Sequence, residues 1–92
     1  MSTVAERLAK VLIAGNLTVS DLARWFERPR PTVQDWVNGT EPWGAPLDRA
    51  RVEQQLQKLE QMIHSRTGFP VPMSISRAER IDYIARVRSA AQ

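Results

Sequence analysis

Leu17–Gly39, LTVSDLARWFERPRPTVQDWVNG, carries the strongest structural signal in this chain. Apolar residues recur at helical spacing on both sides of its proline-rich centre, which predicts two short helices over 19–26 and 31–38. Pro29 and Pro31 break the chain between them, because proline lacks a backbone donor and biases the residue before it away from the helical conformation. Two short helices joined by a tight break have the dimensions of a helix-turn-helix.

Three more helices are predicted around this segment, over 4–14, 47–66 and 77–89. A Ser or Thr followed three residues later by an acid can form a capping box, which marks a helix start. Such pairs occur at Thr3 and Glu6, Thr18 and Asp21, and Ser76 and Glu79. Gly15 is expected to end the first helix as a left-handed cap. Phe69 and Val71 are expected to pack back on the body. The predicted fold class is all-α with about five helices.

A length of 92 residues corresponds to one small domain. We expect residues 1–46 to form the helix-turn-helix region, and residues 47–92 to complete the core and make an oligomer or partner contact.

The chain has no cysteine and one histidine, His64, so a thiolate metal site and a cysteine nucleophile are excluded. We expect no enzyme activity, no metal, no cofactor and no small-molecule substrate. The longest purely apolar run is Val11–Ala14, which predicts a cytoplasmic protein without a membrane partner.

The net charge of +3 is unevenly distributed. Residues 1–46 are neutral overall, whereas residues 47–92 hold eight basic and five acidic groups. Eleven of the 13 basic residues are arginine, which suits forked contacts to phosphate but equally follows from a GC-rich genome. Helix 77–89 is basic, and its acids favour a solvated, ion-paired face over a binding patch. Its charged residues are Arg77, Glu79, Arg80, Asp82, Arg86 and Arg88.

Residues 17–39 resemble the helix-turn-helix of the phage-repressor and Cro-like DNA-binding family. The matching positions are Leu22, Ala23, Phe26, Val33, Trp36, Asn38, Gly39 and Pro42. The turn departs from the family, because Glu27 and Arg28 stand where the family usually has a glycine and then an apolar residue. Pro29 and Pro31 also make the turn stiffer. The resemblance covers roughly residues 1–46, and no family is recognised in the remainder.

The resemblance implies sequence-specific binding to double-stranded DNA by a small bacterial or phage transcriptional regulator. The second helix of such a motif lies in the major groove, where its outward residues are the candidate base contacts. These are Arg30, Pro31, Thr32, Gln34, Asp35 and Asn38. The candidate phosphate contacts are Ser20, Arg24 and Arg28. Arginine, glutamine and aspartate have the donors or acceptors to pair with guanine, adenine and cytosine edges respectively.

Two other functions stay open from the sequence. An outward face of Gln, Asp and Asn is also typical of any solvated helix, and a neutral motif region is unfavourable for a DNA binder. One alternative is a DNA-packaging or recombination accessory of the small-terminase type. The other is a helix-turn-helix module that binds protein rather than DNA.

An apolar stripe in helix 47–66 is the candidate homodimer contact. It consists of Val52, Leu56, Leu59 and Ile63. Core packing within one chain is the alternative, because the stripe is too short to indicate a coiled coil. Trp36 is predicted to be buried, whereas Trp25 is expected either to pack on a later helix or to mark a contact surface.

Overall fold

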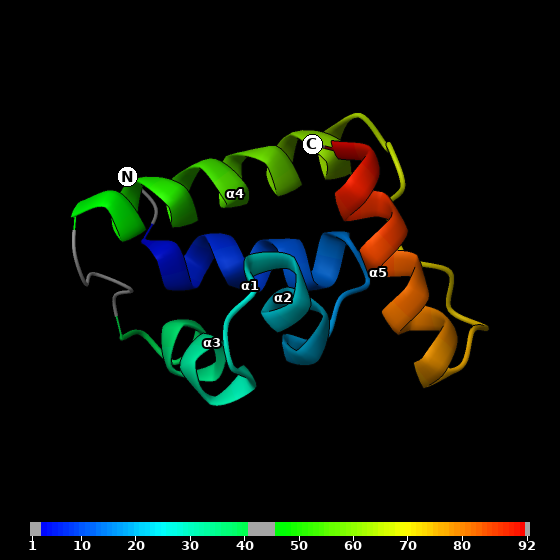
Figure 1. Cartoon of the computed structure of the whole chain (residues 1–92), viewed down its shortest axis with the longest axis horizontal. Coiled ribbons are helices and arrows are strands. Elements are labelled where there is room, and N and C mark those ends of the chain that lie inside the picture. Colours follow the sequence, from blue (N-terminus) through cyan, green and yellow to red (C-terminus); the bar gives the residue numbers. More distant parts are fainter. Residues whose placement is uncertain (1–2, 41–45, 92) are drawn as a thin grey trace.

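Five α-helices form the part of the chain that the computed structural model describes, residues 3–40 and 46–91 (Figure 1). They are α1 (Val4–Ala14), α2 (Val19–Phe26), α3 (Arg30–Val37), α4 (Pro46–His64) and α5 (Arg77–Ala91). The all-α prediction is confirmed, and α1 and α2 have the predicted bounds. The helices α3 and α4 each begin one residue early and end early, and α5 continues to Ala91. Pro42, the last family-like position, lies outside the described residues.

The helices α2 and α5 begin at the predicted capping boxes. The Thr18 hydroxyl accepts from the Asp21 N–H at 3.1 Å, and the Asp21 carboxylate accepts from the Thr18 N–H at 2.9 Å. Ser76 and Glu79 make the same reciprocal pair, both at 3.2 Å. Each capping box satisfies N–H groups that the first helical turn leaves without a partner.

The prediction of a left-handed cap at Gly15 is wrong. Gly15 has a φ of −92°, and Asn16 takes the left-handed conformation with a φ of 52°. A Cβ at Gly15 would lie 2.9 Å from the Val11 carbonyl oxygen and 2.9 Å from Leu17 Cδ1. Glycine is therefore required here by close packing, because real Cβ contacts are not this short.

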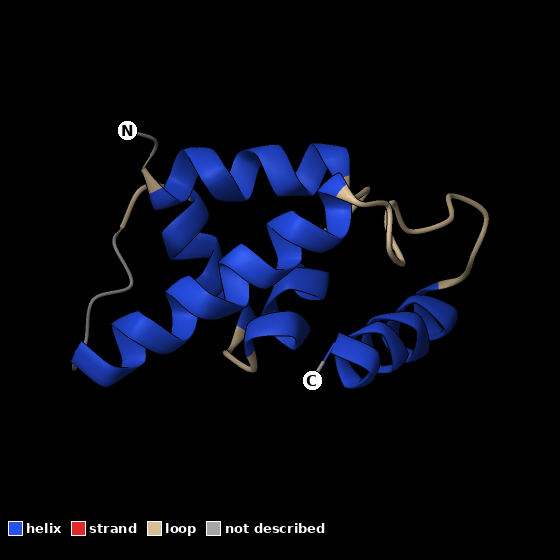
Figure 2. Ribbon diagram, turned by 90° about the horizontal axis from the view of Figure 1, so that it is seen from above, coloured by secondary structure: helices blue, strands red, loops and turns tan. Residues whose placement is uncertain are grey.

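The helix α1 lies between α4 on one side and the α2–α3 pair on the other, while α5 packs against α2 at one end (Figures 1 and 2). One apolar core joins both halves of the sequence. It includes Leu8, Leu22, Phe26 and Trp36 from the first half and Leu56, Leu59, Phe69, Val71 and Ile84 from the second. Phe69 and Val71 thus pack back as predicted.

Hydrogen bonds and ion pairs also connect the first half of the sequence to the second. The Val71 N–H donates to the Gly15 carbonyl oxygen at 2.9 Å, and Asn16 Nδ2 donates to the Val71 carbonyl oxygen at 2.7 Å. Arg7 of α1 lies between two carboxylates of α4, at 2.6 Å from Glu53 and 2.5 Å from Glu60. The hydrogen bonds to Glu60, followed by the one to Glu53, raise the pKa of the Arg7 guanidinium against the opposing effect of burial.

The apolar stripe of α4 faces the interior of its own chain. Val52, Leu56 and Leu59 are at most 3% exposed, and Ile63 is partly buried against the same core. These side chains pack within their own chain, as the core-packing alternative predicted. They are therefore not available for an exposed homodimer contact. A stripe of this kind identifies the buried face of a helix, but it does not identify the surface that covers it.

Candidate nucleic-acid interface

The helix α3 has one buried face and one open face. Val33 and Trp36 are buried, and Trp36 packs edge-on to Phe26 with ring centroids 5.6 Å apart. This confirms the predicted burial of Trp36 and fixes α3 against α1 and α2. The helix α3 itself lies on the side of α1 away from α4 (Figure 1).

All six candidate base contacts reach the surface. The exposed ones are Arg30, Pro31, Asp35 and Asn38, and the half-buried ones are Thr32 and Gln34. Gln34 Nε2 donates to Asn38 Oδ1 at 3.2 Å, one helical turn further along. This bond aligns two amide side chains on the open face, where both would meet a ligand that lies along the helix.

The turn between α2 and α3 is built by a residue in the left-handed region. Glu27 has φ 55° and ψ 47°, and the Arg28 N–H donates to the Ala23 carbonyl oxygen at 3.0 Å. The family-like sequences usually have glycine here, since glycine adopts this conformation without steric cost. The Glu27 carboxylate lies 2.7 Å from Arg88 of α5. This ion pair favours glutamate at a position where the backbone is strained for any residue other than glycine.

Arginines surround an open hollow of about 310 Å³ between α2, the turn and the start of α5. Its lining residues are Ser20, Ala23, Arg24, Glu27, Arg28, Arg30 and Arg77; we call it the arginine hollow. It brings together all three candidate phosphate contacts and the candidate base contact Arg30. A second hollow of about 320 Å³ shares Ser20, Arg24 and Arg77 with the first. The arginine hollow has four cationic side chains and one acid, which suits an anionic ligand.

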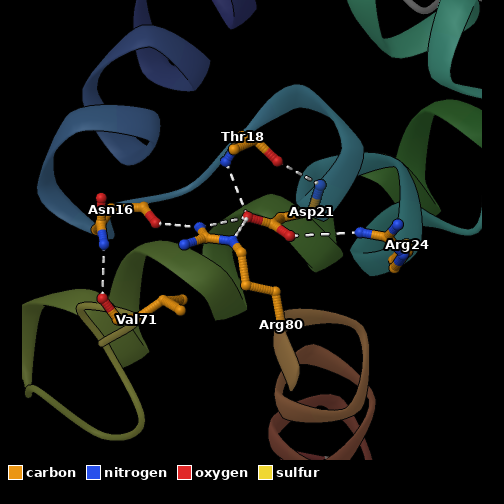
Figure 3. A network of polar contacts seen from close by, with 6 residues as sticks. All are labelled: Asn16, Thr18, Asp21, Arg24, Val71 and Arg80. Atoms are coloured by element: carbon orange, nitrogen blue, oxygen red, sulfur yellow. Dashed lines mark hydrogen bonds and ion pairs between the residues drawn. The ribbon is translucent and has the colours of Figure 1, made fainter. Parts of the chain in front are cut away.

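A buried carboxylate, Asp21, lies at the centre of a polar network (Figure 3) and lines the second hollow. Asp21 is 1% exposed, and its Oδ2 accepts from Arg80 Nε at 3.1 Å and Nη2 at 2.6 Å. Its Oδ1 lies 3.4 Å from Arg24 Nη1. Arg80 also donates to the Asn16 carbonyl oxygen at 2.5 Å. The ion pair therefore holds α5 against the start of α2, and it neutralises Asp21, which lines the second hollow.

The roles of Arg77 and Arg80 were not predicted from the sequence. Their spacing places both on one face of α5, as residues three apart in a helix are neighbours. Nothing local indicates that this face meets α2, because Arg80 and Asp21 are 59 positions apart. The sequence favoured a solvated, ion-paired face for this helix. Arg80 and Arg88 are in fact paired, but with acids of α2 and its C-cap.

The comparisons with known proteins provide no relative: no protein-family model, curated protein or solved structure matches the chain. Among the residues that the structure describes, no cluster of acids and histidine could hold a metal ion. No helix in that part is both long and apolar enough to cross a membrane.

Proposed function

We propose that this protein binds double-stranded DNA sequence-specifically and acts as a transcriptional regulator. In this proposal α3 enters the major groove and the arginine hollow receives the adjoining phosphates. The observation that supports it most is the position of Arg30. This residue is the first of α3 and also lines the arginine hollow, so the open face of α3 and the basic surface are continuous.

The distribution of charge in the fold supports the proposal, although residues 1–46 are neutral overall. Two of the acids in this region, Asp21 and Glu27, are ion-paired with Arg80 and Arg88 of α5. The arginines that line the hollow therefore produce a positive potential, which DNA phosphates neutralise with release of counterions.

The open face of α3 supplies groups that can distinguish bases. Gln34 can pair with adenine, Arg30 with guanine, and Asp35 can accept from the amino group of cytosine. Each well-formed pair contributes about 1–3 kcal/mol of discrimination against the wrong base. Phosphate contacts position the protein, whereas these side chains select the sequence.

Selection from a pool of random duplex DNA, followed by sequencing of the retained fraction, tests the proposal. We expect the wild-type protein to enrich a defined motif. Gln34→Ala and Arg30→Ala should lose that motif while their circular dichroism spectra and melting temperatures stay those of the wild type. Gln54→Ala, a change on exposed surface of α4, is the matched control and should enrich the wild-type motif.

Three outcomes would contradict parts of the proposal. Unchanged motifs for both α3 variants would show that α3 does not read the bases. Retention without enrichment would contradict sequence specificity and favour a packaging or architectural role. No retention at low salt, where phosphate contacts are strongest, would contradict DNA binding and favour a protein partner.

A further inference from the structure

Arg77 is the part of the basic surface that the helix-turn-helix does not supply. It is the first residue of α5, and its side chain is exposed. It lines both the arginine hollow and the second hollow, next to Arg24 in each. Two cationic groups from opposite halves of the sequence, Arg24 and Arg77, thus line the same two hollows as Ser20 of α2.

The other arginines of α5 that face α2 have partners there. Arg80 binds Asp21 at 2.6 Å, and Arg88 binds Glu27 at 2.7 Å. Within the described part of the chain, the Arg77 side chain has no ion-pair or hydrogen-bond partner. A cation next to other cations at the mouth of a hollow is stabilised when an anion enters, because the anion offsets their mutual repulsion.

We propose that Arg77 binds a DNA phosphate beside the one that Arg24 contacts, so that the DNA interface includes the C-terminal helix. This inference rests on the proposed function. Arg77 supplies a forked donor that matches the geometry of a phosphate group. The C-terminal half then has a direct part in binding, in addition to completing the core.

The position of Arg77 is fixed before any ligand arrives. Asp21 and Arg80 hold α5 on α2 one helical turn beyond Arg77, in a contact that is buried on the Asp21 side. The adjoining connector is also held, through Val71 and the α1–α2 loop. A backbone that is already ordered loses less conformational entropy on binding than a flexible basic tail does.

The test compares Arg77→Gln with Arg86→Gln in duplex binding measured by fluorescence anisotropy over a range of salt concentrations. The probe is a fluorescein-labelled random-sequence duplex, which needs no knowledge of the target site. Arg86 is an exposed arginine of the same helix, and it lies about two and a half turns further on, which places it on the opposite face. Both variants therefore lose one positive charge, but only one loses it at the hollow.

We expect Arg77→Gln to reduce the magnitude of the slope of log K against log salt by about 0.9, the value for one phosphate contact. The same relation gives an affinity roughly fivefold lower at about 0.15 M salt. Arg86→Gln should keep the wild-type slope. Melting temperatures should be unchanged for both, since both side chains are exposed.

Equal slopes for the two variants and the wild type would overturn the role of Arg77 and leave the proposed function standing. A failure of the wild-type protein to bind the duplex at low salt would overturn the proposed function, and this inference with it. Equal decreases in both variants would show that only total charge matters, which also overturns the specific contact.

Discussion

Asp21→Ala should destabilise the whole protein, because it removes the acceptor that Arg80 and the Thr18 N–H share. Breaking a buried ion pair by deleting one partner costs about 3–5 kcal/mol. The Arg80 side chain keeps 17% of its surface exposed, so some of its hydration returns and the lower end of about 3 kcal/mol applies. A chain of this length has a total stability of about 5–14 kcal/mol. The loss is therefore a large fraction of the free energy of unfolding.

Thermal unfolding followed by far-ultraviolet circular dichroism measures this effect. One kcal/mol corresponds to about 4–8 °C for a small domain, so the melting temperature should fall by at least about 12 °C. Asp82→Ala, which removes an exposed acid of α5, is the control and should stay within about 0.5 kcal/mol of the wild type. Equal melting temperatures for the two variants would show that the Asp21–Arg80 contact does not hold α5 on α2.

Two more changes test the packing of α3 and the turn before it. Trp36→Ala should cost about 3–5 kcal/mol in urea unfolding, because it deletes a buried aromatic side chain; a midpoint close to that of the wild type would place Trp36 outside the core. Glu27→Gly should be more stable than Glu27→Ala by about 1 kcal/mol, since both lose the Arg88 ion pair but only glycine relieves the left-handed strain. Equal stabilities in the same urea assay would show that Glu27 is unstrained.

Local signals predicted the helices well. Capping pairs and apolar spacing placed α1 and α2 at their observed bounds, because the interactions that start and stop these helices lie within a few residues of one another. The error at Gly15 has a local cause too. Both Gly15 and Asn16 are residue types that adopt the left-handed conformation, and the structure has it at Asn16.

Contacts between distant segments could not be predicted. The apolar stripe of α4 was visible in the sequence, but whether α1 or a second chain covers it depends on docking. Trp25 was ambiguous for the same reason; it is buried, and its Nε1 donates to the Gln55 carbonyl oxygen of α4 at 3.0 Å. In the candidate interface, the α3 residues followed from the motif. Arg77 belongs to the candidate interface only because α5 packs against α2, a contact that the sequence does not reveal.

Amide chemical-shift perturbation by nuclear magnetic resonance is the sharpest test of the proposed DNA interface, because it reports which surface the DNA touches. A short duplex would be added to labelled protein at low salt. We expect the perturbed amides to map to α3, the start of α2, the turn at Glu27 and Arg28, and the first turn of α5. Perturbations confined to α4, or none at all at low salt, would contradict this expectation.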